Sequence, residues 1–129
     1  MSSTADLDLQ VILTSGADDT HRAVFGLMSA LAAATSGMKV SVVLTMNGAY
    51  WASKYVGNEP VIPGYLPVAE YLESIQEMGG RVEGCSSCVD NFCPAPKGDD
   101  GLKELRDGIE RIGLTSIVHR MPTTRTVTF

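Results

Sequence analysis

The sequence predicts a single α/β domain built on a mostly parallel β-sheet with helices on both faces. Short apolar runs rich in β-branched residues alternate with stretches of helical periodicity, which is the pattern of parallel strands joined by helical crossovers. A length of 129 residues with 44% hydrophobic side chains suits one compact core. We therefore assign residues 1–129 to one domain.

The N-terminal part of the chain predicts a strand, a helix and a second strand. Residues 9–14 form an apolar run that is typical of a strand buried on both faces. Residues 18–20 are good helix-capping residues, and apolar side chains then recur at helical spacing up to Gly37. Residues 39–46 repeat the buried-strand pattern, so this region predicts a βαβ unit with parallel strands.

The middle of the chain predicts a long loop, a helix and a third strand. Residues 49–67 are irregular, and only 49–56 have the pattern of a short helix. Pro67 is well placed as the first residue of a helix with one apolar face, which stops at Gly79. Residues 81–85 then form a short strand that ends on a cysteine.

The C-terminal part carries weaker patterns. Periodicity predicts a helix over residues 101–113, with its apolar positions facing inward. Residues 115–121 have the pattern of a short helix, and residues 125–129 that of a final strand. Strands that alternate with helices to the end of the chain extend the α/β pattern.

Three clustered cysteines mark the region where we expect chemistry. Cys85, Cys88 and Cys93 lie within nine residues, too close together to link distant segments. Ligands of parallel α/β sheets bind beyond the carboxyl ends of the strands. The loops 15–20 and 47–51 converge there with the Cys-x-x-Cys segment, so the cysteine pair lies where this architecture places its chemistry.

Cys85 and Cys88 are the candidate catalytic residues. Cys88 is the better candidate for a thiolate near neutral pH, because a helix that starts at this point favours negative charge at its N-terminus. The pair could also close a disulfide, or Cys85 could resolve a persulfide or sulfenic acid formed on Cys88. Alternatively, these residues are small hydrophobic side chains without reactivity.

A soft-metal site is the competing interpretation. Cys85, Cys88 and Cys93 with His21 or His119 would form a Cys3His set for zinc, and the three thiolates would suit copper(I). Structural zinc sites usually have a second Cys or His pair at a distance, and the chain holds only two histidines. We therefore expect no metal and no cofactor, and a non-catalytic oligomeric module that binds a soft metal is the alternative.

Composition excludes several functional classes. The net charge of -5 argues against a nucleic-acid partner. No apolar run approaches the roughly 20 residues of a membrane-spanning helix, and residues 1–6 lack the layout of a secretory signal, so we expect a cytoplasmic protein without a membrane partner. No phosphate-binding glycine motif occurs. Aromatic residues in the loop after residue 49 indicate either loop packing or a subunit interface, and we expect a homo-oligomer; they are Tyr50, Trp51, Tyr55 and Tyr65.

The order of these segments resembles the DsrE/DsrF-like family of small sulfur-relay proteins. The resemblance covers most of the chain, and it rests on the sequence of the segments rather than on one diagnostic motif. The residues that carry it are the opening strand 11–16 with Asp18-Asp19, the second strand and glycine turn 42–50, Pro63-Gly64-Tyr65, the helix that ends at Gly79-Gly80, the strand 81–85, the Cys-x-x-Cys entry to the next helix, and the closing strand 126–129.

This resemblance implies a single-domain three-layer α/β sandwich with a mostly parallel sheet of about five strands and assembly into trimers or hexamers. It also implies a cysteine that moves persulfide or thiosulfonate sulfur between donor and acceptor proteins, a role that falls on Cys85 and Cys88 as a possible sulfurtransferase site. The resemblance places a fourth strand near 107–111. The sequence departs from the family pattern at 89–97, which holds a third cysteine and two prolines where a regular helix is expected.

Overall fold

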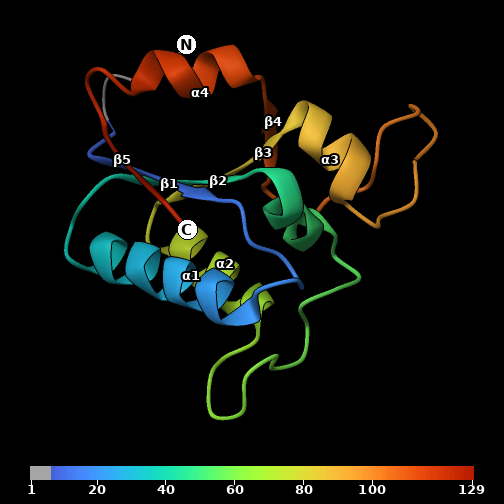
Figure 1. Cartoon of the computed structure of the whole chain (residues 1–129), viewed down its shortest axis with the longest axis horizontal. Helices are drawn as coiled ribbons and strands as arrows, with labels where there is room; N and C mark the ends of the chain where they lie inside the picture. The colour runs from blue at the N-terminus through green and yellow to red at the C-terminus, as the bar shows by residue number, and fades with distance from the viewer. Residues whose placement is uncertain (1–6) are drawn as a thin grey trace.

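The computed structural model describes residues 7–129 and contains one five-stranded, all-parallel sheet. The strand order is β4-β3-β2-β1-β5, with α1 and α2 on one face and α4 on the other (Figure 1). The predicted three-layer α/β sandwich is therefore confirmed. The elements are β1 (Leu9–Leu13), α1 (Thr20–Thr35), β2 (Val40–Leu44), the 3-10 helix η2 (Met46–Ala52), α2 (Val68–Glu77), β3 (Arg81–Cys85), α3 (Ser86–Phe92), β4 (Glu110–Ile112), α4 (Leu114–Arg120) and β5 (Arg125–Thr128).

The N-terminal βαβ unit forms as predicted. β1 and β2 pair in parallel along their whole length. The carboxylate of Asp19 caps α1 by accepting a hydrogen bond from the backbone N–H of Arg22 at 3.1 Å. The chain leaves α1 at Gly37, whose φ of 92° lies in the left-handed region that favours glycine.

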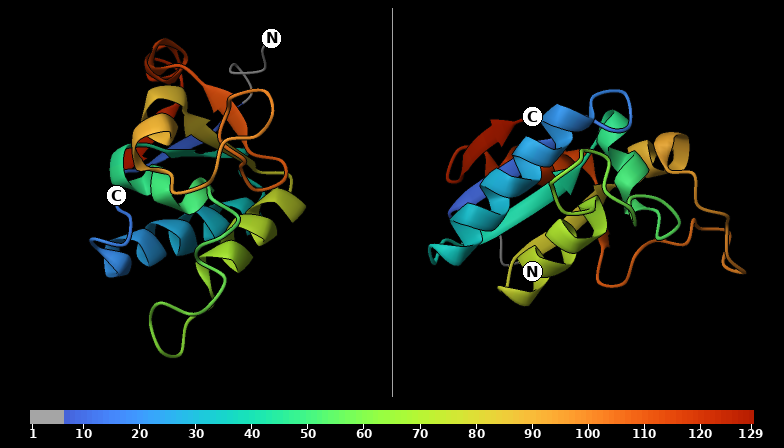
Figure 2. Two further views of the ribbon diagram at one scale, coloured as in Figure 1. Left: turned by 90° about the vertical axis from the view of Figure 1, so that its right-hand side faces the viewer. Right: turned by 90° about the horizontal axis from the view of Figure 1, so that it is seen from below.

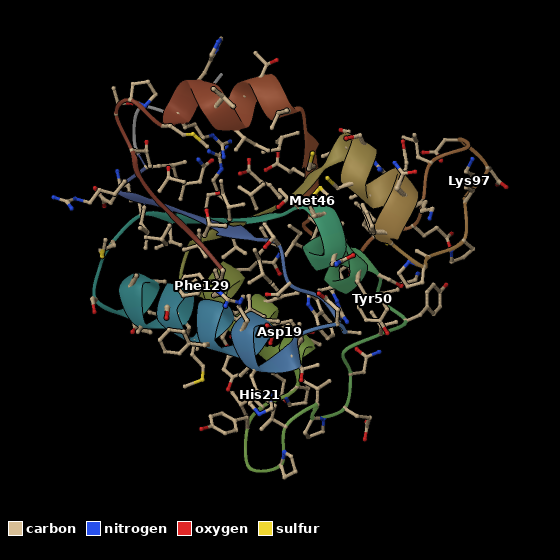
Figure 3. All side chains as sticks on the ribbon, viewed as in Figure 1. Asp19, His21, Met46, Tyr50, Lys97 and Phe129 are labelled. Atoms are coloured by element: carbon tan, nitrogen blue, oxygen red, sulfur yellow. The ribbon has the colours of Figure 1, made fainter. Side chains whose placement is uncertain are left out.

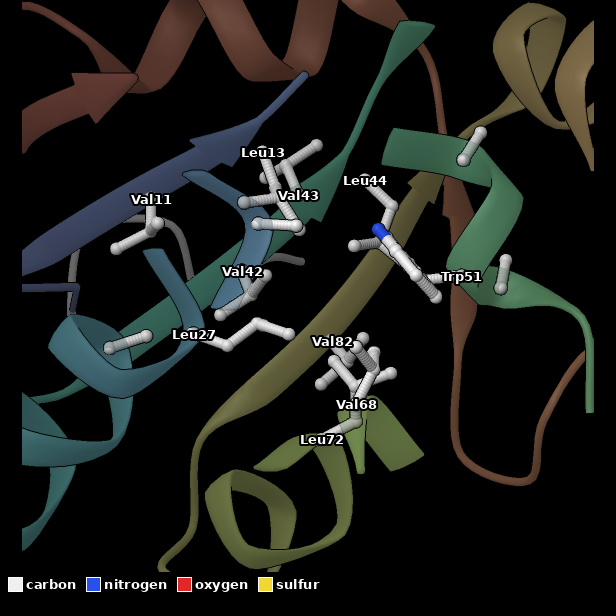
Figure 4. Packing of buried hydrophobic residues seen from close by; sticks show 14 of the residues in the cluster. Val11, Leu13, Leu27, Val42, Val43, Leu44, Trp51, Val68, Leu72 and Val82 are labelled. Atoms are coloured by element: carbon white, nitrogen blue, oxygen red, sulfur yellow. The ribbon is translucent and has the colours of Figure 1, made fainter. Parts of the chain in front are cut away.

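One face of the sheet forms the apolar core. Val11, Leu13, Val42, Leu44 and Val82 point from the strands toward α1 and α2 and are almost completely buried (Figure 4). Removing one such side chain from water contributes about 1.5–3 kcal/mol to stability. The continuous apolar runs of the strands are explained by this burial, because the sheet is covered on both sides.

The other face carries a buried polar network that binds α4 to the sheet. Alternate positions on the same strands hold Gln10, Ser41 and Glu83. Arg120 of α4 donates hydrogen bonds from Nη1 and Nη2 to the two carboxylate oxygens of Glu83, at 2.6 and 2.8 Å. Its Nη1 also donates to Oε1 of Gln10 at 3.2 Å, and the Ser41 hydroxyl donates to Glu83. α4 is therefore held by a polar anchor as well as by apolar packing.

Two glycines allow the carboxyl ends of β1 and β2 to pack backbone against backbone. A Cβ atom on Gly48 would lie 2.0 Å from the carbonyl oxygen of Leu13, and one on Gly16 would lie 2.2 Å from that of Asn47. The N–H of Gly48 donates to the carbonyl of Thr14 at 3.1 Å. No side chain fits between these two loops, so glycine is required at both positions.

The prediction from periodicity of a helix over residues 101–113 is wrong. Gly101 and Gly108 both have a φ of 80°, which does not occur inside a right-handed helix. Leu105, Ile109 and Ile112 pack partly against the core, whereas Leu102, which was predicted to face inward, is exposed. β4 lies beside β3, as the family resemblance implied, but it spans Glu110–Ile112 rather than 107–111.

The regular helix expected after the Cys-x-x-Cys motif is present. α3 spans Ser86–Phe92 and ends at Cys93, so Pro94 and the second proline lie beyond it. The segment between η2 and α2 is a loop that projects away from the sheet (Figure 2). Within residues 7–129, no helix is long and apolar enough to cross a membrane.

Candidate functional site

Cys85 and Cys88 lie at the carboxyl end of β3, an inner strand between β4 and β2. Cys85 is the last residue of β3 and the N-cap of α3, and Cys88 follows in the first turn of that helix. Met46 lies where β2 passes into η2, between α4 and α3 (Figure 3). The parallel pairing of β2 and β3 therefore brings the loop after β2 to the cysteine pair.

A mainly apolar cavity of about 290 Å³ lies beside the two thiols. α4 supplies one wall, and the ends of β1 and β2 with the start of η2 supply another. None of the lining residues is charged. They are Ile12, Thr45, Met46, Cys85, Ser87, Cys88, Leu114, Ile117 and Met121.

Both thiols are largely buried, with Cys85 4% and Cys88 8% exposed. Burial raises the pKa of the Cys88 thiol above its ordinary value, and the neighbouring Cys85 thiol raises it further. A hydrogen bond from the backbone N–H of Met46 and another from the Ser87 hydroxyl act in the opposite direction, but they are weaker. The direction of this pKa shift is opposite to the Cys88 thiolate that the sequence predicts, and burial is its largest cause.

Met46 holds a strained backbone conformation at the edge of this cavity. Its φ of 50° is the one left-handed value among the non-glycine residues of 7–129, and this conformation costs an L-residue about 1–2 kcal/mol. The backbone N–H of the same residue lowers the pKa of the Cys88 thiol, against the effect of burial. The strained residue is therefore one that favours the Cys88 thiolate.

The buried ion pair between Glu83 of β3 and Arg120 of α4 lies next to the cavity. Glu83 precedes Cys85 by two residues on β3, and Arg120 lies between the cavity-lining residues Ile117 and Met121 of α4. Burial favours a raised pKa of the Glu83 carboxyl, but hydrogen bonds from Arg120 and Ser41 and the nearby positive charges bring it below its ordinary value. The pair is therefore ionised at neutral pH and fixes the cavity wall to the sheet.

Cys93 does not join the cysteine pair in a metal site. It is 1% exposed, lies beyond α3, and its carbonyl oxygen accepts a hydrogen bond from the Lys103 ammonium. His21 lines a different cavity with Phe25, and His119 is exposed near the end of α4. Over residues 7–129, no three His, Cys, Asp or Glu side chains are grouped closely enough to hold a metal ion. The Cys3His set considered from the sequence is not assembled.

The loop aromatics divide into packed and exposed residues. Trp51 is buried, and its Nε1 donates to the carbonyl oxygen of Ser15 at 3.0 Å, so it packs the loop after β1 against η2. That loop does not line the thiol cavity, although the sequence suggested that all three loops converge there. Tyr55 and Tyr65 are exposed and remain candidates for a subunit interface.

Sequence reasoning missed the residues that form the cavity with the cysteines. Met46 is the last residue of the strand predicted over 39–46, and the rule that ligands bind at the carboxyl ends of strands could have indicated it. Leu114 and Met121 had no such signal, because their position over the thiols depends on how α4 crosses the sheet. Apolar residues on a short helix otherwise predict only core packing.

Comparisons with known proteins identify the family and the fold of this chain. The sequence model of the DsrE/DsrF-like family matches residues 8–129. The crystal structure of the ychN protein from E. coli is similar, with a TM-score of 0.75 and 18% identity over 95% of this chain and 99% of that chain. A conserved protein of unknown function from Bacteroides thetaiotaomicron, BT1422, is also similar, with a TM-score of 0.65 and 17% identity over 100% of both chains. At these identities the two structures show a shared fold. A comparison with curated proteins found no match.

Proposed function

Because this chain belongs to the DsrE/DsrF-like family, we propose that it is a sulfur carrier or sulfurtransferase that holds sulfane sulfur on Cys88 or Cys85. The observation that carries the proposal is the position of both thiols in one cavity at the carboxyl ends of the central strands. Family membership supports a sulfur-relay role. Two adjacent thiols give the site a means to hold and pass on a sulfur atom.

The proposed loading step moves one sulfur atom without net oxidation. A cysteine thiolate attacks the outer sulfur of a persulfide donor, R–S–SH, the S–S bond of the donor breaks, and the thiolate R–S⁻ leaves. The cysteine is now a persulfide. The Met46 N–H supports the step at Cys88 because it stabilises negative charge on that sulfur.

The second thiol supports a transfer within the pair. When the Cys85 thiolate attacks the outer sulfur of a Cys88 persulfide, the S–S bond at Cys88 breaks, and Cys88 leaves as a thiolate. The sulfane sulfur then resides on Cys85. The same displacement by an acceptor thiol unloads the site, so the two cysteines share one sulfur atom between donor and acceptor.

We further infer that the partners are sulfur-donor and sulfur-acceptor proteins together with copies of this chain. Exposed apolar residues on the loop between η2 and α2 support self-association, namely Tyr55, Tyr65 and Leu66.

Mass spectrometry of the protein after incubation with a panel of persulfide, polysulfide and polythionate donors tests the proposal. We expect a gain of one or more sulfur atoms, assigned by fragmentation to Cys88 or Cys85. Cys88→Ser and Cys85→Ser should each reduce loading, and the residual signal identifies the carrier. Cys93→Ser is the matched control and should load fully, because Cys93 does not line the cavity. Unmodified Cys85 and Cys88 with every donor would refute the proposal.

A further inference from the structure

We propose that the cavity over Cys85 and Cys88 accepts uncharged, apolar sulfane donors, such as organic polysulfides, and excludes anionic donors such as thiosulfate and tetrathionate. The identity of the donor rests on the proposed function. The charge selectivity itself is a property of the cavity walls, and it is measurable with reagents that transfer no sulfane sulfur.

The walls of the cavity are apolar on every side that the structure describes. Leu114, Ile117 and Met121 line it from α4, and Ile12 and Met46 line it from the sheet and η2. Apart from the thiols, the polar lining side chains are the neutral hydroxyls of Thr45 and Ser87. An apolar ligand that enters gains from the removal of its surface from water.

None of the cationic residues within 7–129 lines the cavity. The guanidinium of Arg120 is paired in bidentate fashion with Glu83, and Arg111 of β4, beside Gly84, donates from Nη2 to the carbonyl oxygen of Lys103 at 2.6 Å. Arg81 begins β3, so its backbone lies roughly 13 Å along the strand from Cys85. A dianion such as thiosulfate would lose hydration here without gaining a counter-charge, which is strongly unfavourable. The raised pKa of Cys88 shows the same resistance of this site to negative charge.

An uncharged donor can deliver sulfur in one displacement. A cysteine thiolate attacks the central sulfur of a dialkyl trisulfide, R–S–S–S–R, one of its S–S bonds breaks, and an alkanethiolate leaves and takes a proton from solvent. The cysteine retains the chain S–S–S–R, which holds the sulfane sulfur. The apolar alkyl group fits walls built from leucine, isoleucine and methionine side chains.

The selectivity is measured in a Cys93→Ser background with two thiol reagents of similar size, one uncharged and one anionic. Propyl methanethiosulfonate is uncharged, and sulfonatoethyl methanethiosulfonate is an anion; in both cases the thiolate attacks the sulfenyl sulfur and methanesulfinate leaves. Rates are divided by those of a free small thiol. We expect Cys85 and Cys88 to favour the uncharged reagent by about tenfold or more, because an unpaired anion is desolvated at the site. Equal rates, a preference for the anion, or no reaction with either reagent would overturn the inference.

A matched pair of lysine variants ties the effect to the cavity. Leu114 lines the cavity and is 65% exposed, so Leu114→Lys places an ammonium at its rim with little risk to folding. This variant should raise the relative rate of the anionic reagent by about tenfold through direct attraction. Val118→Lys adds the same charge to the same helix at a 47% exposed residue outside the cavity lining and should leave the preference unchanged. Equal effects of the two variants would attribute the preference to overall charge and overturn the inference.

Parallel loading with dipropyl trisulfide and with thiosulfate separates this inference from the proposed function. Loading from the trisulfide alone supports both. Loading from both donors with equal efficiency leaves the sulfur carrier intact and refutes the selectivity. An intact reagent preference with no loading from any donor refutes the sulfur-carrier function and, with it, the assignment of the donor.

Discussion

The ionisation of Cys88 is decided by opposing effects at a single residue. Burial favours the neutral thiol, and the adjacent Cys85 thiol adds to this preference. The Met46 N–H and the Ser87 hydroxyl favour the thiolate but do not overcome burial. Attack on a sulfur donor requires the thiolate. A partner or ligand that rearranges the cavity can therefore change the reactivity of this thiol by changing its solvation.

We predict that alkylation of Cys88 by iodoacetamide is slow at pH 7 and accelerates only at alkaline pH, with its inflection above the pKa of about 8.5 of a free thiol. The sign follows from the raised pKa, because a raised value leaves less thiolate at any given pH. In Cys85→Ala the inflection should move to lower pH, since the neighbouring thiol contributes to the shift. Site-specific rates are measured by peptide mass spectrometry in a Cys93→Ser background. An inflection below that of a free thiol would contradict the prediction.

At the scale of elements, α4 and β3 form one unit through the Glu83–Arg120 pair. β3 presents Cys85, and α4 supplies Leu114, Ile117 and Met121 to the opposite wall of the cavity. Because the ion pair connects these two elements within a few residues of the site, it contributes to stability and holds α4 over the cavity.

We predict that Arg120→Met lowers the free energy of unfolding by about 3–5 kcal/mol, because it leaves the Glu83 carboxylate buried without its guanidinium. The double variant Glu83→Gln/Arg120→Met should recover much of this loss, since it removes the uncompensated charge. Arg125→Met, at an exposed arginine of β5, is the control and should change stability by no more than about 0.5 kcal/mol. Urea denaturation at pH 7 gives these values. Equal losses in Arg120→Met and the double variant would show that the charge pair is not the cause.

At the scale of the whole molecule, the carboxyl ends of all the parallel strands lie at the same end of the sheet, and the two thiols lie there with them. The loop between η2 and α2 extends from this body (Figure 2). Tyr55, Tyr65 and Leu66 on this loop are exposed. Three exposed apolar side chains on one projecting loop suit an interface with a second copy of the chain.

We predict that light scattering at micromolar concentration gives a mass that is a multiple of the monomer mass. Tyr65→Ser/Leu66→Ser should shift the mass toward the monomer and leave the circular dichroism spectrum unchanged, because both side chains are exposed. Met78→Ser, which changes an exposed apolar residue just after α2, is the control and should retain the mass of the wild type. A wild-type protein that is monomeric under these conditions would refute self-association.

The sequence by itself determined where β1, β2, β3 and β5 lie along the chain and placed Cys85 and Cys88 at the end of β3. Runs rich in apolar and β-branched residues, such as 9–14 and 39–46, are informative because a strand covered on both faces is mostly apolar. Local signals such as Asp19 and Gly37 marked the helix ends because capping is a property of neighbouring residues.

Only the tertiary structure decided the state of the thiols and the nature of their cavity. The replacement of the helix predicted over 101–113 by a loop and β4, and the placement of α4, depend on contacts between residues distant in the chain, which periodicity does not report. The raised pKa of Cys88 has the same origin, because the cavity beside it is lined by Met46 and by the side chains of α4. Desolvation is set by whatever surrounds a group in space, so no local pattern around the Cys-x-x-Cys motif could have revealed it.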